Sequence, residues 1–260
     1  MFARQSPSSP QENYLLNALP SNVLQRLVPH LELAPLQMGD VIYESGGTLS
    51  HAYFPASAVV SLLHVLEEGA STEFAVVGNE GVLGIALIMG GETMPNRAVV
   101  QSAGYAHRLR AQLLKNEFNN CETLEKLLLR YSQFLLTQVG QTAVCNRHHT
   151  ILERLSRWLL SSLDRLPSNE LLVTHEMIAN VLGVRREGVT DAVGKLQRRH
   201  LIRRGRGHIT VIDRERLEEA ACECYGVVKS EQQRLLPGIC REPAREISWF
   251  HTIPQARVAA

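Results

Sequence analysis

The chain has 260 residues, of which 45% are hydrophobic, enough for one or two domains with apolar cores. Residues 1–125 hold 6 Lys and Arg against 12 Asp and Glu, whereas residues 126–260 hold 21 against 14. This asymmetry predicts one module that faces nucleic acid and one that does not. No apolar run is long enough to cross a membrane, the first residues lack the apolar core of a signal peptide, and the five cysteines show no disulfide-framework spacing, so we expect a cytoplasmic protein without a membrane partner.

Residues 1–13 are predicted to be a disordered lead, and residues 14–115 a β-roll sensor domain. A helical pattern over residues 14–33 breaks at Pro20 and restarts with Ser21 as N-cap. From Leu36 to about residue 110, short runs rich in Val, Ile, Tyr and Phe alternate with turn signals every ~8–12 residues. This pattern predicts an antiparallel roll of about eight strands.

A glycine-rich turn at residues 78–84 is the candidate ligand site of the roll. It leads into a short apolar helix, whose exposed backbone N–H groups can hold an anion. Arg97 on the next strand can face a phosphate, and Glu80 can accept a hydrogen bond from a ribose hydroxyl. A plain turn beside a solvated arginine is the simpler alternative. The candidate ligand-binding residues are Glu80, Gly81 and Arg97.

A long dimerisation helix is predicted for residues 116–150, where glycine and proline are nearly absent. Seven of its residues alternate in steps of four and three, which is the heptad spacing of a coiled coil. We expect a parallel homodimer through this seam, with packing against the same chain as the alternative. The predicted interface residues are Leu124, Leu128, Tyr131, Leu135, Gln138, Thr142 and Cys145.

Residues 151–225 are predicted to form a winged helix-turn-helix DNA-binding domain. Thr174 suits the N-cap of a first helix over residues 175–182, and Gly183 suits the sharp turn that follows. The second helix, from about residue 185 to 199, has an apolar inner stripe and a charged N-terminal half. That half meets base edges in such motifs, so we expect Arg186 and Glu187 to read bases.

A basic hairpin follows the second helix. Two short strands, at residues 201–202 and 209–212, flank a turn with Gly205 and Gly207, and such a turn is suited to clamp phosphates. Asp213 is placed to cap one more helix. A helical hairpin with a solvated basic face is the alternative to DNA binding. The predicted DNA-binding residues are Thr174, Arg185, Arg186, Glu187, Thr190, Asp191, Lys195, Arg203, Arg204, Arg206 and His208.

Residues 226–260 are predicted to be a loosely ordered tail that contacts a partner. Near its start, Cys222-x-Cys224 with Cys240, and the pair His148-His149, are weak indications of a metal or redox site, and we assign no metal ligand. The chain shows no Walker-type loop, nucleophile elbow or paired carboxylates, so we predict that it is not an enzyme.

The order of roll, long helix and winged helix-turn-helix resembles the Crp/Fnr family of bacterial transcription regulators over roughly residues 14–225. The motifs that carry the resemblance are Gly39-Asp40-x-Ile42 with Gly46, and EMIANVLGVRREGVTDAVGKLQRRHLI at residues 176–202. The resemblance implies an α+β fold, a homodimer, a palindromic operator in double-stranded DNA, and RNA polymerase as a partner. Arg186 and Glu187 match the family's base-reading pair, whereas Asp191 stands where a second base-reading arginine is common.

The sensor half departs from the cyclic-nucleotide-binding members of the family. Those carry a Gly-Glu turn and then an Arg-Ser/Thr-Ala string, whereas this chain reads Asn79-Glu80-Gly81 and Asn96-Arg97-Ala98. We therefore expect that cyclic AMP is not the natural effector. An iron–sulfur cluster needs four thiolates, usually near the N-terminus, and no cysteine precedes Cys121. No cofactor is predicted, although haem or another effector stays open because of His51, His64 and His107.

Together these features predict a homodimeric, sequence-specific DNA-binding transcription regulator, controlled by an unidentified signal at the β-roll. The signal would move two recognition helices into or out of the ~34 Å spacing of adjacent half-sites. The alternative is a nucleotide-responsive regulatory subunit that acts through protein contacts.

Overall fold

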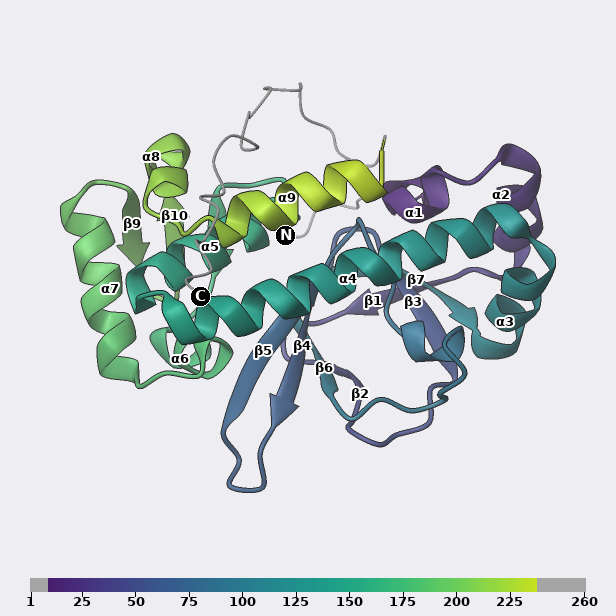
Figure 1. The fold of residues 1–260 in the computed structure, drawn as a ribbon, viewed down its shortest axis with the longest axis horizontal. Coiled ribbons are helices and arrows are strands. Elements are labelled where there is room, and N and C mark those ends of the chain that lie inside the picture. Colours follow the sequence, from purple (N-terminus) through teal and green to yellow (C-terminus); the bar gives the residue numbers. More distant parts are fainter. Residues whose placement is uncertain (1–8, 238–260) are drawn as a thin grey trace, which may run out of the picture.

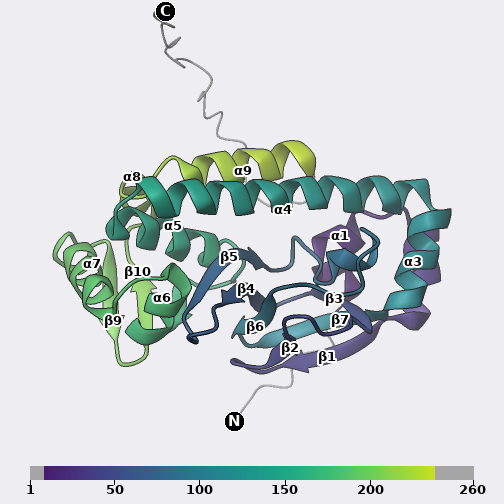
Figure 2. The same cartoon turned by 60° about the horizontal axis from the view of Figure 1, so that its bottom comes forward.

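The computed structural model describes residues 9–237, and this part of the chain is an α+β protein arranged along one long helix, α4 (Glu122–His148) (Figures 1 and 2). A β-roll lies against the middle of α4, and a winged helix-turn-helix lies at its C-terminal end. Within this part, no helix combines the length and apolar character that a membrane span requires. The predicted fold class is confirmed.

Short helices open the described chain: η1 (Pro10–Glu12), α1 (Tyr14–Asn17), α2 (Ser21–Leu27) and η2 (Val28–His30). The predicted restart at Ser21 is confirmed, but Pro20 occupies the N-cap. Part of the predicted disordered lead is ordered, because Asn13 is fully buried and its amide donates to the carbonyls of Pro55 and Gly81, each at 2.9 Å. Buried amides need such partners, so Asn13 fixes the start of the chain onto the roll.

Seven antiparallel strands form the roll between Glu32 and Arg110, in two sheets of order β1-β7-β3 and β2-β6-β4-β5. The first strand begins before the predicted start at Leu36. It contains Pro35, which is tolerated because β1 is an edge strand. The strands are β1 (Glu32–Leu36), β2 (Val41–Tyr43), β3 (His51–Pro55), β4 (Val59–Val65), β5 (Ser71–Val77), β6 (Arg97–Ser102) and β7 (Gly104–Arg110).

The core of the roll is closed by helices. After β5, the glycine-rich turn leads into the short helix η3 (Ile85–Leu87), as predicted. After β7, α3 (Ala111–Asn120) ends before Cys121, whose extended backbone separates it from α4. The long helix therefore begins at Glu122 rather than at residue 116. Tyr131 and Phe134 of α4 are fully buried in the apolar core that the roll shares with this helix.

The DNA-binding domain has its own apolar core, in which Trp158, Ile178 and Leu196 are buried. The predicted N-caps are confirmed: Thr174 Oγ1 accepts from the Met177 amide at 3.2 Å, and Asp213 Oδ1 accepts from the Arg216 amide at 3.0 Å. One strand, β8, was not predicted and completes a sheet of order β8-β10-β9. The elements are α5 (Ile151–Leu163), β8 (Glu170–Leu172), α6 (His175–Leu182), α7 (Arg186–Arg198), β9 (Ile202–Gly205), β10 (His208–Val211) and α8 (Arg214–Glu219).

A helix takes the place of the first part of the predicted loose tail. It is α9 (Cys224–Leu235), and it lies beside α4 in both views (Figures 1 and 2). Leu235 and Leu236 are buried in the core of the roll, so residues 226–237 belong to the packed fold. The rest of the predicted tail, with Cys240, lies outside the described residues.

Candidate nucleic-acid interface and its coupling to the roll

The exposed N-terminal end of α7 carries the predicted base-reading side chains. Arg185 is the N-cap, and Arg186 and Glu187 form the first turn; all three are exposed. The opposite side of α7 packs into the domain core, where Gly188 permits close approach to α5. A Cβ at that position would lie 2.7 Å from Ile151 Cδ1. One side of α7 therefore packs against α5 and the domain core, while its charged N-terminal end is exposed.

His175 links the two helices of the motif, and the sequence did not mark it as functional. Its Nδ1 lies 3.0 Å from Thr190 Oγ1, and the Thr190 hydroxyl also donates to the carbonyl of Arg186 at 3.0 Å. Thr190, a predicted DNA contact, is thus engaged within the protein. Burial lowers the pKa of His175, and the charges of Arg204 and Arg186 lower it further. The recognition helix and the hairpin therefore gather positive charge on one face.

The basic hairpin has the predicted shape. β9 and β10 pair from Gly205 with His208 onward, and Gly207 in the turn has φ of +78°. The ring of His208 covers Gly205, where a Cβ would lie 2.0 Å from the ring. His208 is therefore half-buried against its own hairpin. The exposed cations of this hairpin are Arg203, Arg204 and Arg206.

Asp191 and Lys195, two more predicted DNA contacts, bind each other. Their side chains are exposed on α7, one turn apart, with 2.7 Å between Oδ2 and Nζ. Such a surface pair is weak, about 0.3–0.5 kcal/mol, so DNA phosphate can compete for Lys195.

The three candidate ligand residues are occupied by contacts within the chain. Glu80 is only 2% exposed, and its Oε1 lies 2.7 Å from Nη2 of Arg165, the residue two positions beyond the end of α5. Arg97 forms a half-exposed ion pair with Glu44 at 3.0 Å. Gly81 lies against Tyr131, because a Cβ there would be 2.5 Å from the tyrosine hydroxyl. Glu80 therefore binds the residue that follows α5 in this structure, and its expected contact with a ribose stays a prediction.

The Glu80–Arg165 pair belongs to a polar interface between the roll and α5. Gln101 on β6 accepts from Ser61 at 3.3 Å and donates to Ser162 on α5 at 2.9 Å. Glu73 on β5 is buried at this interface, and burial raises its pKa to about 7, although hydrogen bonding to Ser61 and the charges of Arg157 and Arg165 act against the shift. An ionisable carboxyl thus lies between the roll and α5 of the helix-turn-helix domain.

The roll also contacts the helix-turn-helix itself. The turn residue Gly183 has φ of +61°, as its predicted role requires, and a Cβ there would lie 2.5 Å from Oγ1 of Thr72 on β5. The hairpin of β4 and β5 reaches α6 in Figure 2. The hairpin of the roll therefore lies against the turn that precedes α7.

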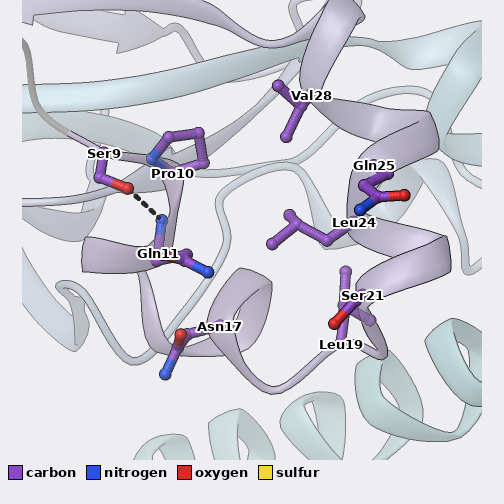
Figure 3. A pocket seen from close by; sticks show the side chains of 9 residues that line it. All are labelled: Ser9, Pro10, Gln11, Asn17, Leu19, Ser21, Leu24, Gln25 and Val28. Atoms are coloured by element: carbon purple, nitrogen blue, oxygen red, sulfur yellow. Dashed lines mark hydrogen bonds between the residues drawn. The ribbon is translucent and has the colours of Figure 1, made fainter.

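Two surface cavities of the described residues lie away from the candidate ligand residues. The larger, about 340 Å³, lies between η1 and α2 and is lined by Gln11, Leu24 and Val28 among others (Figure 3). The second, about 290 Å³, lies between the start of α4 and the end of α9. Neither includes Glu80, Gly81 or Arg97 in its lining.

The predicted dimer seam of α4 is turned toward its own chain. All seven of its side chains are buried within one protomer, most against the roll, and Cys145 against Cys222 and Cys224. The alternative of packing against the same chain therefore holds for this stripe. A second stripe, in the same four-three spacing, remains exposed and includes Leu129 and Leu136, at 49% and 64% exposure. Its members are Leu129, Gln133, Leu136, Gly140 and Ala143.

Comparison with known proteins gives one match to the helix-turn-helix domain and others that cover most of the chain. Residues 153–220 match the model of the Crp-like helix-turn-helix domain. The chain is 29% identical over 198 residues to the transcriptional regulator SdrP of Thermus thermophilus, covering 73% of this chain and 94% of that protein.

Solved structures show the same architecture. A transcriptional regulator of the CRP/FNR family from Thermus thermophilus is 25% identical, with a TM-score of 0.56, over 73% of this chain and 98% of that structure. FixK2 from Bradyrhizobium japonicum is 17% identical, with a TM-score of 0.64, over 74% of this chain and 98% of that structure.

Proposed function

Because this chain belongs to the Crp/Fnr family of transcription regulators, we propose that it is a homodimer that binds a palindromic operator under the control of a signal at the β-roll. The observation that carries the proposal is the exposure of Arg186 at the start of α7 and of Arg203 and Arg204 on β9, the strand that packs against this helix. Arginine pairs bidentately with guanine in the major groove, and a basic hairpin holds the adjacent phosphates. A DNA target agrees with the cytoplasmic location expected from the sequence.

The exposed stripe on α4 is the surface through which we propose that two copies of the chain dimerise. The stripe keeps heptad spacing over three turns and more, its leucines are half or more exposed, and Gly140 and Ala143 allow two helices to approach closely. It lies about 140° around the helix from the buried seam, at 100° per residue. Two helix-turn-helix domains related by a two-fold axis match the symmetry of a palindrome.

The signal at the roll would act through the interface with α5. The ion pair of Glu80 with Arg165, the bridge from Gln101 to Ser162, and the contact of Thr72 with Gly183 all join the roll to the DNA-binding domain. An effector that favours one arrangement of this interface would shift the population of DNA-binding orientations. When the dimer acts as an activator, RNA polymerase is its expected protein partner.

Selection of bound fragments from a random DNA pool by the purified, ligand-free protein tests the proposal. We expect enrichment of a palindrome with half-sites about one helical turn apart. If no sequence is enriched, even after cell extract is added, and the protein instead co-purifies stably with an enzyme, it acts through protein contacts and the proposal fails.

Three variants then separate base reading from phosphate binding. Arg186→Ala should relax specificity at one base pair by about 1–3 kcal/mol, whereas Arg203→Ala should weaken all sequences about equally and lower the salt slope by about one. Arg234→Ala removes the same charge at the far end of α9 and should leave DNA binding unchanged (Figure 1). Equal effects of Arg186→Ala on specific and random DNA would refute base reading.

A further inference from the structure

Three cysteines and one histidine form a compact cluster where α4, α5 and α9 meet. Cys145 lies in the last turn of α4 and His149 is the C-cap of that helix, while Cys222 lies between α8 and α9 and Cys224 is the first residue of α9. The three cysteines are free, buried, and separate from both apolar cores. The three thiols therefore pack against one another in a small cluster of their own.

The distances within the cluster suit one tetrahedral metal ion. One donor atom from each of the four residues lies within 4.8 Å of every other donor. Cys145 Sγ is 3.5 Å from Cys222 Sγ, and Cys224 Sγ is 3.6 Å from Nδ1 of His149. With Zn–S of about 2.3 Å, the edge between two sulfurs of a tetrahedral zinc site is about 3.8 Å. Only small side-chain shifts separate the observed donors from that geometry.

The second nitrogen of His149 is positioned as in metal sites. Nε2 lies 3.3 Å from a carboxylate oxygen of Glu223, while Nδ1 faces the sulfurs. Histidine ligands almost always donate their other N–H to a carboxylate, carbonyl or water, which fixes the tautomer that leaves a lone pair for the metal. This arrangement is independent of the clustering of the cysteines and points to the same ligand.

We propose that Cys145, His149, Cys222 and Cys224 bind one Zn²⁺ ion. A donor set of three thiolates and one imidazole selects soft or borderline metals over calcium and magnesium, and four protein ligands with no open position describe a structural zinc site. Three thiolates leave the site with one net negative charge. Arg154 and Arg157 on α5 are close enough to interact with Cys145 electrostatically and supply the countercharge.

The ion would fasten α9 to the junction of α4 and α5. Two ligands come from the end of α4, and the other two from residues 222 and 224, just beyond the matched Crp-like domain. Thr150, the residue after His149, is the N-cap of α5. The proposed site therefore holds α9 at the point where the DNA-binding domain leaves the long helix.

Metal content of the intact chain, purified under reducing conditions, is the first test. We expect about one zinc per chain, retained on dialysis against a weak chelator. After removal of zinc, titration with Co²⁺ should give the intense visible absorption of a tetrahedral thiolate-bound ion, saturating at one equivalent. A reduced chain that carries no zinc and gives no such Co²⁺ spectrum overturns the proposal. A disulfide between Cys145 and Cys222 in protein purified under the same conditions would also overturn the proposal.

Matched variants assign the ligands. Cys224→Ser and His149→Asn should lose stoichiometric zinc, whereas Cys121→Ser, another buried cysteine, and His148→Asn, the exposed neighbour, should retain it. Glu223→Gln on the surface should fold normally and bind Co²⁺ about 10–100-fold more weakly. Equal zinc retention by His149→Asn and His148→Asn would refute the assignment. This test needs no DNA, so it stands or falls separately from the proposed operator binding.

Discussion

The ion pair between Glu80 and Arg165 gives the sharpest prediction about how the roll holds the DNA-binding domain. Both side chains are buried, at 2% and 7% exposure, and Nη2 and Nε of Arg165 lie 2.7 and 2.8 Å from the same carboxylate oxygen. Arg165→Met preserves much of the aliphatic stem but leaves the carboxylate buried without a counter-charge. Breaking a buried pair in this way costs about 3–5 kcal/mol of unfolding free energy.

A double-mutant cycle isolates the contact itself. Glu80→Gln alone leaves the guanidinium unpaired and should also destabilise the fold, whereas Glu80→Gln in the Arg165→Met background removes a charge that has already lost its partner. The double variant should therefore be more stable than the sum of the single effects predicts, by about 1–3 kcal/mol. That coupling energy measures the attraction between the two side chains.

Urea unfolding followed by circular dichroism measures these free energies. All variants are compared at one protomer concentration, because a dimer is stabilised by mass action. Arg108→Met is the matched control, since Arg108 forms the same kind of pair with Glu32 at 2.8 Å, with both side chains more than 40% exposed. Exposed pairs contribute about 0–1 kcal/mol. If Arg165→Met lowers the free energy of unfolding no more than Arg108→Met does, the proposed stabilising role of the buried Glu80–Arg165 ion pair is refuted.

Three further predictions concern the exposed stripe of α4, the buried Glu73 between the roll and α5, and the packing of Gly81 against Tyr131. Leu136→Glu should dissociate the dimer in analytical ultracentrifugation, whereas Val65→Glu, an exposed apolar residue of the roll, should not; a dimeric Leu136→Glu would contradict the proposed stripe. Because the folded pKa of Glu73, about 7, lies above its usual value of 4.5, its contribution to unfolding free energy should fall by about 3 kcal/mol as pH rises between these values. Urea unfolding at several pH values in this range should show that the fall is absent in Glu73→Gln. If the variant shows the same pH dependence as the parent, Glu73 is not the group responsible. Gly81→Ala should lower the melting temperature, because the added Cβ would lie 2.5 Å from the hydroxyl of Tyr131, whose ring is fully buried; a melting temperature equal to that of the parent would contradict this packing.

The helix-turn-helix was predictable because its signals are local. Thr174 and Asp213 cap helices within three residues of themselves, and Gly183 adopts the left-handed conformation that a sharp turn requires. The apolar period of α7 likewise depends only on neighbouring residues. Most strands of the roll and the hairpin follow from the same local patterns, whereas β1, whose first residues fall in the predicted helical segment, and the three-residue β8 were not predicted.

The function of α4 was harder to predict, because the helix carries two stripes in the same four-three spacing. Sequence spacing identifies both, but only the fold shows which one the roll covers. The stripe with Leu124 and Leu128 is the predicted dimer seam because of its heptad spacing, and the hydrophobicity of its first half places that half in the core. The exposed stripe, with Leu136 and Gly140, is less apolar, as expected for a helix face that is solvated in the single protomer.

Contacts between distant parts of the chain could not be predicted at all. Glu80 lies 85 residues from Arg165, and Cys145 lies 77 residues from Cys222. Nothing in the spacing around either residue marks its partner. The sequence suggested His148-His149 and Cys222-x-Cys224 only as separate fragments, and the helical geometry at the end of α4 decides that His149 and Cys145 join the cluster.

These long-range contacts act on one element, α5. Its N-terminal end follows His149 of the proposed zinc site, and its C-terminal end is followed by Arg165, which binds Glu80 of the roll. Between them, the buried Arg154 donates to the carbonyl of Leu182 at the end of α6, and Ile151 packs against Gly188 of the recognition helix. We therefore expect the orientation of α7 to follow that of α5. Loss of the ion pair releases one end of α5 and loss of the zinc releases the other, so each should change operator affinity without altering a residue that touches DNA.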